Sequence, residues 1–493
     1  MHRRHTRLAA AFAAATLALG TAAVAATTQT AGAQTARAAQ VDPSSPVGLW
    51  APARLTAYSY EGQVYTDLGL KLIAGDKPFE VWSHRASYDQ PITSEWRVGN
   101  GAMTALPDGT LDSFAGLPDF LDVTVTRVKT GAVSAHLTTT TCLNGWSQRV
   151  HPDAPPSSPY PGGCPWNAYT VGSVMGVQAG HAVPAIADYS TNLVLKPGKY
   201  DVVATIADEY VDLFGIAPAD TTATTRMTVK RESFERPATP RASDVLTPAA
   251  HEPKRSSAGH RAPGDPMPDL QSLPAWDIQL NRKGTAIRFA ATVWNAGDSP
   301  LVIDGFRTEE DEDTLTTYQY FFDTDGNQTG HQEVGVMNWH AQNHNHWHFE
   351  DFAQYRLLNE DMSEAVLSNK QSFCLANTDA VDYTVEGADW KPEGTDLSTA
   401  CAGFDALSVR EVLSSGSGDT YMQFRYGQAF PIDDVPNGTY YIAVEANPVL
   451  NLVESDYDNN NAYRKIVLKG KGEKRKVVVE KVGIIDEGMP PWM

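Results

Sequence analysis

Cysteine is scarce in this chain, and long apolar runs are missing from most of it. The 493 residues include four cysteines, 38 glycines and 31 prolines. These counts exclude a small disulfide-held scaffold and a collagen-like repeat. After the first 20 residues, no stretch is apolar over the roughly 20 residues that a membrane-spanning helix needs. The sequence therefore predicts no membrane-spanning domain.

Positive charge is also in deficit. The chain carries 39 Lys and Arg against 59 Asp and Glu, a formal net charge of −20. Such a balance argues against nucleic acid as a partner, because phosphate binding depends on basic residues. An acidic protein attracts cations and cationic substrates instead. With 42% hydrophobic residues, the chain is long enough for two or more domains, each with its own core.

The first 33 residues have the pattern of a secretory signal peptide. A basic start at residues 2–7 precedes an apolar run at 8–19, and A-x-A sites end at Ala25 and Ala33. The apolar run is shorter than the roughly 20 residues that cross a bilayer, which favours cleavage over a membrane anchor. We expect a secreted, extracellular protein that is cleaved near residues 25–33.

An even number of cysteines in an exported chain predicts two disulfides. Proximity along the chain favours the pairs Cys142–Cys164 and Cys374–Cys401. Each would close a loop of about 20 to 30 residues and stabilise the fold by roughly 3 kcal/mol. Because the cysteines lack C-x-x-C spacing, we interpret them as structural bonds and not as a zinc or redox site.

Composition divides the chain into two large parts. Residues 46–230 alternate short apolar segments with Gly, Pro and Asp turns, whereas 231–265 are rich in Pro, Ala, Ser and charge without periodicity. The second pattern is typical of a linker. Strand patterns resume over 266–468. A basic tail, 469–493, is either flexible or adds a strand through 477–479.

Apolar residues with a period of two indicate β-strands in both parts. Residues 287–293 alternate as in a half-buried strand, and 193–205 read as strand, Pro197-Gly198 turn, strand. One short helix is expected, at 361–369. The predicted fold is all-β, with two antiparallel β-sandwich-like domains joined by the linker.

Four of the 13 histidines lie within nine residues, at positions 340, 344, 346 and 348. Residues i, i+2 and i+4 of a strand share a face, with alternate Cα atoms about 7 Å apart. His344, His346 and His348 would therefore project three imidazoles together and hold a metal with an open coordination position. Imidazole suits zinc and copper, and raw affinity favours copper.

Several motifs surround these histidines in a fixed order. They are H-N-H-W-H at 344–348, N-K-Q-S-F-C-L at 369–375, D-T-Y at 419–421, P-N-G-T-Y at 436–440 and E-S-D-Y-D-N-N at 454–460. Together they resemble the catalytic domain of the lysyl oxidases. The resemblance spans about 266–468 and leaves residues 41–230 outside it.

The resemblance implies a copper site and a cofactor made from the chain itself. Copper falls on His344, His346 and His348, and the cofactor, lysine tyrosylquinone, falls on Lys370 and Tyr421. The implied activity is oxidation of primary amines, such as lysine side chains or related amines, to aldehydes. O₂ is the oxidant, and H₂O₂ and ammonia are released. The partners are thus a primary-amine or peptidyl-lysine substrate and O₂.

One position departs from the family pattern. Gln354 stands where family members carry a histidine, and an amide cannot serve as a general base. Glu350, Asp351 and His340 are the alternatives, each of which could equally orient a metal ligand. The sequence leaves the base unassigned.

A second metal site is predicted near the end of the domain. Glu454, Asp456, Asn459 and Asn460 offer hard oxygens that suit Ca²⁺, and the resemblance adds Asp269 and the carbonyl of Leu270. The alternative is a solvated turn. The segment D-T-D-G-N at 323–327 looks like an EF-hand loop, but its Gly comes too early, and a hairpin turn is expected there.

Two other functions stay open at this point. The histidines could serve a zinc or copper hydrolase or oxidase without a quinone, which metal content and carbonyl reagents would distinguish. The chain could also be a non-catalytic cell-surface binding protein, which would lack the Lys370–Tyr421 cross-link. For residues 46–230 the alternatives are binding of substrate, wall polymer or a partner, and shielding of the site until cleavage.

Overall fold

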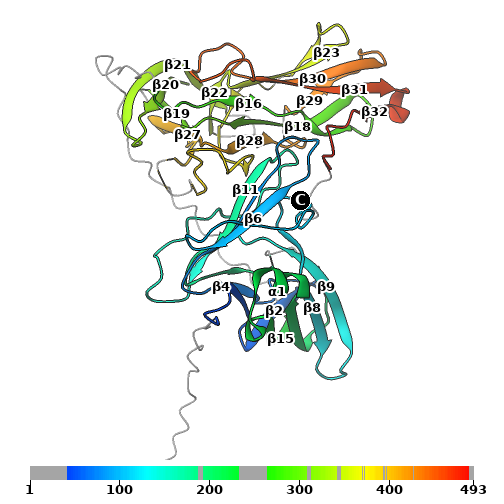
Figure 1. Cartoon of the computed structure of the whole chain (residues 1–493). Helices are drawn as coiled ribbons and strands as arrows, with labels where there is room; N and C mark the ends of the chain where they lie inside the picture. Colours follow the sequence, from blue (N-terminus) through cyan, green and yellow to red (C-terminus); the bar gives the residue numbers. More distant parts are fainter. Residues whose placement is uncertain are drawn as a thin grey trace, which may run out of the picture. The chain divides into compact units, whose positions relative to one another are not determined.

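The computed structural model in Figure 1 describes most of the chain. The described residues are 41–186, 192–231, 264–307, 313–340, 346–368, 370, 372–391, 395, 397–425 and 427–487. The predicted signal peptide, nearly all of the predicted linker and His344 lie outside them. Among the residues described, no helix has the length and apolar content that crossing a membrane requires.

The all-β prediction is confirmed. Strands occupy both large parts of the chain, and the paired strands among the described residues are antiparallel except for the parallel pair β2 (Arg54–Tyr60) and β15 (Thr222–Arg231). Each part has its own buried apolar core. One core includes Phe79, Phe120 and Tyr210, and the other includes Phe289 and Trp347.

In the amino-terminal part, the described strands form three sheets. In order of neighbours these are β1 (Val47–Trp50), β4 (Lys71–Ala74), β12 (His181–Pro184) and β10 (Gln148–Arg149); β11 (Gly172–Val177), β5 (Phe79–His84), β6 (Thr93–Val98) and β7 (Thr104–Ala105); and β13 (Asn192–Val194), β3 (Gln63–Tyr65), β2, β15, β14 (Gly198–Ile206), β8 (Leu117–Arg127) and β9 (Val133–Thr141).

In the carboxy-terminal part, the described strands form three further sheets. These are β16 (Leu270–Ser272), β18 (Ala286–Asn295), β28 (Ser417–Tyr421) and β26 (Asp379–Ala380), with β17 (Trp276–Leu280) and β29 (Ala429–Pro431) also on β18; β25 (Ser372–Phe373), β22 (His346–Glu350), β21 (Gln328–His340), β20 (Thr314–Phe322), β19 (Leu301–Phe306) and β27 (Ser408–Leu413); and β24 (Glu364–Leu367), β23 (Ala353–Asn359), β30 (Gly438–Ala446), β31 (Asn461–Lys469) and β32 (Lys476–Val479).

The helix prediction is wrong at 361–369. Asp361 Oδ1 accepts the Ser363 amide at 3.0 Å, and Met362 has φ +66°, which an α-helix does not allow. The chain then forms β24. A helix occurs instead at α1 (Asp208–Phe214), where Tyr210 and Phe214 are buried and Gly215 ends the helix in the left-handed conformation. It spans only seven residues, too few for a clear helical period.

Other local predictions agree with the structure. Strands β13 and β14 flank the Pro197-Gly198 turn, and the Asp323 amide donates to the Asn327 carbonyl at 3.0 Å in the β20–β21 hairpin. The basic tail does add a strand, because β32 pairs with β31. Both disulfides are present as predicted, with Cα–Cα distances of 5.8 Å for Cys142–Cys164 and 6.0 Å for Cys374–Cys401.

Strand β18 differs from the prediction in its burial. Its alternation does form a strand, but both faces are buried from Phe289 onward, so it is not half-buried. Phe289 and Ala291 face the main carboxy-terminal core. Ala290 and Trp294 lie instead in a separate cluster that includes Tyr169 from the amino-terminal part.

Candidate metal and cofactor site

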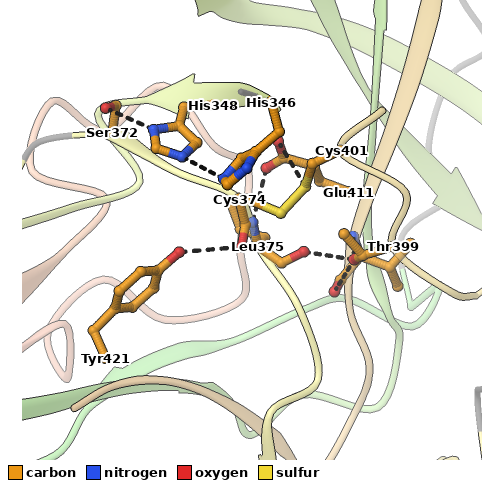
Figure 2. Close-up of a disulfide and its surroundings, with 10 residues drawn as sticks. His346, His348, Ser372, Cys374, Leu375, Thr399, Cys401, Glu411 and Tyr421 are labelled. Carbon is orange, nitrogen blue, oxygen red and sulfur yellow. Dashed lines mark hydrogen bonds between the residues drawn. A yellow bond between two sulfur atoms is a disulfide. The ribbon is translucent and has the colours of Figure 1, made fainter. Parts of the chain in front are cut away.

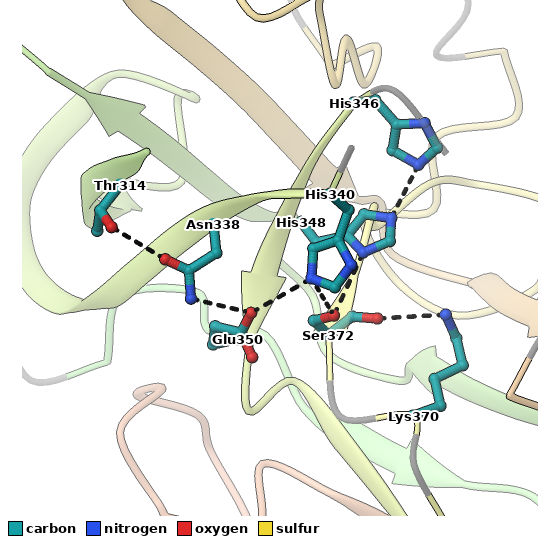
Figure 3. A network of polar contacts seen from close by, with 8 residues as sticks. All are labelled: Thr314, Asn338, His340, His346, His348, Glu350, Lys370 and Ser372. Carbon is teal, nitrogen blue, oxygen red and sulfur yellow. Dashed lines mark hydrogen bonds and ion pairs between the residues drawn. The ribbon is translucent and has the colours of Figure 1, made fainter. Parts of the chain in front are cut away.

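The histidine cluster lies on the paired strands β21 and β22. His346 and His348 share one face of β22, as the alternation predicts, and their Nε2 atoms lie 2.8 Å apart. His348 is buried, whereas His346 is partly exposed. Figure 3 shows both rings turned toward each other. His344, the third predicted ligand, lies outside the described residues.

The spacing of these two nitrogens fits a shared metal ion. Imidazole nitrogens bind such ions at about 2.0 Å. Two of them at a right angle would lie roughly 2.8 Å apart, the geometry of a tetragonal Cu(II) site. The observed separation is 2.8 Å. The two nitrogens are therefore close enough to bind one metal ion together.

A polar network surrounds the pair and orients it. Ser372 Oγ lies 3.3 Å from His348 Nδ1 and 3.1 Å from His340 Nε2. His340 in turn lies 3.8 Å from Glu350, which also accepts a hydrogen bond from Asn338. Hydrogen bonds to the second ring nitrogen fix the orientation of a metal-binding histidine. His340 and Glu350 thus belong to the histidine network.

Lys370 and Tyr421 lie side by side, although 51 positions separate them. Lys370 Nζ is 4.1 Å from the centroid of the Tyr421 ring, and it donates to the Ser372 carbonyl at 3.2 Å. The Tyr421 hydroxyl donates to the Cys374 carbonyl at 3.2 Å, as Figure 2 shows. The ring also packs edge-on against Phe373, with centroids 5.1 Å apart.

Burial changes the proton affinity of both groups. Lys370 is 7% exposed, and burial lowers the pKa of its amine to about 8. Burial also raises the pKa of the Tyr421 hydroxyl well above its ordinary value. A buried amine loses the hydration that stabilises its charged form. Much of the Lys370 amine is therefore neutral, and nucleophilic, in mildly alkaline solution.

Asp419 is a further ionisable group at this place, and the sequence reasoning gave it no role. It stands two residues before Tyr421 on β28, is 3% exposed, and has one oxygen, Oδ2, without a hydrogen-bond partner in the described part of the chain. Burial raises the pKa of its carboxyl, and the nearby Lys370 charge opposes that rise. Asp419 lies two residues before Tyr421, and residues i and i+2 of a strand share a face. That spacing was the signal that could have identified it.

The Cys374–Cys401 disulfide adjoins the site. Cys374 supplies the carbonyl that holds the Tyr421 hydroxyl, and the next residue, Leu375, donates its amide to the buried Glu411 at 2.9 Å. These contacts fix the backbone beside the ring. The disulfide is consequently close enough to the site to restrain it.

The structure brings most of the predicted calcium ligands together. Asn459 Nδ2 donates to Asp269 at 3.0 Å, and Glu454 accepts from Asn460 Nδ2 at 2.8 Å and from the Leu270 amide at 2.8 Å. The Oδ1 atoms of Asn459 and Asn460 are buried and have no hydrogen-bond partner among the described residues. Unpartnered amide oxygens beside two carboxylates fit a hard cation such as Ca²⁺.

Asp456 differs from the other predicted calcium ligands. Its side chain is exposed and accepts the Asp458 amide at 2.8 Å in a local turn. Asp351, the remaining candidate for the general base, and Gln354, the position that departs from the family pattern, are also placed. Asp351 lies in the left-handed conformation directly after β22, with φ +59°, and Gln354 lies in β23 opposite Glu445.

Comparison with known proteins finds one family model, Lysyl oxidase, over residues 319–479. The chain is 35% identical to lysyl oxidase homolog 4 of Mus musculus, 34% to lysyl oxidase homolog 2 of Homo sapiens and 32% to lysyl oxidase homolog 3B of Danio rerio, over 123 residues each. The alignments cover 25% of this chain. They cover only 14% of the first two relatives and 13% of the third.

Proposed function

We propose that the protein is a secreted copper-dependent amine oxidase of the lysyl oxidase family, since the Lysyl oxidase family model matches residues 319–479 and the relatives named above align with part of the chain. It oxidises primary amines, such as lysine side chains or related amines, to aldehydes with O₂ and releases H₂O₂ and ammonia. Copper is held by His344, His346 and His348. Lysine tyrosylquinone, built from Lys370 and Tyr421, is the cofactor.

The contact between Lys370 and Tyr421 carries this proposal. A lysine with an ordinary structural role keeps its ammonium in water, whereas the amine of Lys370 is enclosed 4.1 Å from the ring centroid. Burial lowers its pKa to about 8, which makes a neutral amine available as a nucleophile. The histidine pair stands beside the same backbone, since Ser372 contacts both His348 and Lys370. A hydrolase that used only the histidines would not need this pairing.

The residues of the site have separable tasks. When present, the quinone would supply an electrophilic carbonyl for a primary amine, and copper with O₂ would supply the oxidation of the tyrosine ring to the quinone. His346 and His348 would hold the metal, and Ser372 orients the His348 ring. The contacts of Phe373 and the Cys374 carbonyl hold the Tyr421 ring and its hydroxyl. Asp419 offers a buried carboxyl that can hold a proton beside Lys370.

The charge of the chain indicates the class of substrate. The net charge of −20 favours approach of cationic amines such as peptidyl lysine.

We propose that Ca²⁺ binds Asp269, the Leu270 carbonyl, Glu454, Asn459 and Asn460, with Asp456 joining when the ion is present. The ion would connect the start of the domain, at β16, to the start of β31.

Turnover with a carbonyl reagent tests the proposed function. Protein matured with copper in air is expected to produce H₂O₂ from a lysine-containing peptide, and phenylhydrazine should abolish this activity by a stoichiometric, coloured adduct. Lys391→Met removes a lysine outside the site and is expected to keep both the activity and its sensitivity to phenylhydrazine. A metal-dependent activity that phenylhydrazine leaves intact would contradict the quinone mechanism and favour the metal-only alternative.

A further inference from the structure

The sheet that carries Tyr421 has a second buried face. On β28, Tyr421 packs with the main carboxy-terminal core, whereas Thr420 points to the opposite side. On β18, Thr292 lies on that same opposite side, where its hydroxyl is 2.7 Å from the Thr420 hydroxyl. Asp379 of β26 accepts from Thr420 at 3.0 Å. Three strands thus meet in one buried polar cluster directly behind Tyr421.

A residue of the amino-terminal part completes this cluster. Asn167 Nδ2 lies 2.9 Å from Asp379 Oδ2, 3.0 Å from Thr292 Oγ1 and 3.3 Å from Thr420 Oγ1, and its two N–H groups donate to this set of oxygens. Its Oδ1 accepts the Tyr169 amide at 2.9 Å, so both ends of the side-chain amide are held. Asn167 is 5% exposed. A single side chain therefore ties together the three strands that place Tyr421.

The backbone after Asn167 continues the contact. The Val171 amide donates to the Val381 carbonyl at 2.8 Å, and the Tyr383 amide donates to the Gly172 carbonyl at 3.1 Å. At Gly172 the approach is so close that an added Cβ would lie 1.9 Å from Asp382 Oδ1. Only glycine fits this position without displacing its neighbour.

Apolar burial surrounds the polar contacts. Tyr169 is fully buried in one cluster with Trp276, Trp294 and Met422, the residue that follows Tyr421. A contact that is buried, backbone-paired and apolar at its rim resembles a domain core more than a transient interface. The described residues between 41 and 487 accordingly belong to one compact unit.

We propose that the segment 166–172 is a positioning element of the oxidase site and that Asn167 is a positioning residue for Tyr421. The amino-terminal part is then a permanent component of the site and not a shield that cleavage removes. This inference rests on the proposed function in taking Tyr421 as the precursor of the cofactor. It goes beyond that function by assigning the site a component outside the lysyl oxidase match.

The test compares Asn167 with an equally buried asparagine. Asn144 is also 5% exposed, but its bonds to Gly163, Val174 and Gly176 stay within the amino-terminal part. Copper-free protein of the wild type, Asn167→Asp and Asn144→Ala is mixed with copper in air, well below each melting temperature. The initial rate of Lys370–Tyr421 cross-linking is then measured by mass spectrometry.

Asn167→Asp keeps the volume but replaces the amide that donates to Asp379 with a second carboxyl, so that two acids face each other behind Tyr421. A ring displaced by about 1 Å is expected to slow cross-linking by roughly 10- to 100-fold. Asn144→Ala should cross-link within about twofold of wild type even where it melts earlier, since a purely structural loss leaves Tyr421 in place. The pair Asn167→Asp with Asp379→Asn restores one donor and one acceptor and should recover part of the rate. Folded Asn167→Asp that cross-links at the wild-type rate overturns the proposal.

A second experiment tests the docking without reference to the cofactor. A specific protease site is placed between residues 231 and 264, and the full chain is cut. We expect the two pieces to elute together in wild type and in Gly163→Ala, where an added Cβ meets nothing within 4 Å, and to separate in Gly172→Ala. Wild-type pieces that separate overturn the inference. A wild-type protein that never cross-links, but whose pieces stay together, refutes the proposed function and with it the role of Asn167 in cofactor formation.

Discussion

The amine of Lys370 and the ring of Tyr421 lie 4.1 Å apart, with the amine directed at the ring centroid. Lys370 comes from the connection between β24 and β25, and Tyr421 ends β28, so only the folded domain brings them together. Formation of the cofactor should therefore depend on this contact.

Removing either partner of the contact should abolish the cofactor and spare the metal. We expect Lys370→Met and Tyr421→Phe to lower amine oxidation by roughly 10³-fold or more, since each removes an atom that the covalent chemistry needs. Copper content should match wild type, because neither residue belongs to the histidine set. Oxidase activity combined with elemental analysis measures both effects. A Tyr421→Phe variant with wild-type turnover would exclude Tyr421 as the cofactor precursor.

The copper site should depend on Ser372 as well as on the histidines. Ser372→Ala removes the hydroxyl 3.3 Å from His348 Nδ1, and we expect copper affinity to fall about 10- to 100-fold. His348→Ala should cost more, because it removes a predicted ligand. His331→Ala is the matched control: His331 is buried on β21, where its ring packs on Tyr318. Competition titration with a copper chelator gives the affinities, and equal affinity in Ser372→Ala and wild type would argue against this role.

Cofactor formation should accelerate with pH until about pH 8. Burial lowers the Lys370 pKa to about 8, so below that pH the neutral amine, and with it the rate, falls roughly tenfold per pH unit. The linkage to stability has a definite sign. The folded amine releases its proton near pH 8, whereas the unfolded amine does so near 10.5. Stability from this group therefore rises with pH between those values.

Asp419 should shift this pH profile. In its ionised form, Asp419 favours the ammonium form of Lys370 and raises that pKa against the effect of burial. In Asp419→Asn, the midpoint for cross-link formation is expected to move to lower pH, while copper affinity stays at the wild-type level. Mass spectrometry of samples quenched at fixed times between pH 6 and pH 9 gives the rate of cross-linking at each pH, and from these rates the midpoint. An unchanged midpoint would show that the Asp419 charge does not act on the amine.

Calcium should raise the melting temperature through the Asp269–Glu454 cluster. At a concentration about 100 times its dissociation constant, a specific ion adds about 2.7 kcal/mol of stability. Asn460→Ala should remove this gain, because its Oδ1 is one of the unpartnered oxygens. Asp325→Ala, in the exposed β20–β21 turn, should keep it. A melting temperature that is the same in calcium and in chelator would identify the cluster as a solvated turn.

The sequence predicted those features that depend on neighbours along the chain. Alternation located β14 and β18, turn residues located the hairpin at 323–327, and short separations paired the cysteines correctly. The helix predicted at 361–369 failed because an Asx turn and the left-handed Met362 begin a strand there. Local turn chemistry thus overrode the apparent helical pattern.

The periodicity of apolar residues could not predict features that depend on contacts between distant parts of the chain. The second buried face of β18 is covered by residues near 167, more than 100 positions earlier, and no pattern within β18 reveals that cover. Lys370 and Tyr421 were paired only through a family resemblance, since neither residue stands out by composition. Asp419 was missed for the same reason. Its unpartnered oxygen exists only once the strands are packed.

The most direct test of the account is peptide mapping of protein matured with copper and air. We predict that the tryptic peptides containing Lys370 and Tyr421 run as one cross-linked, oxidised species in wild type and as separate peptides in Lys370→Met. Separate, unmodified peptides in wild-type protein that is fully loaded with copper would contradict the account, and the histidine site would then require a different chemistry.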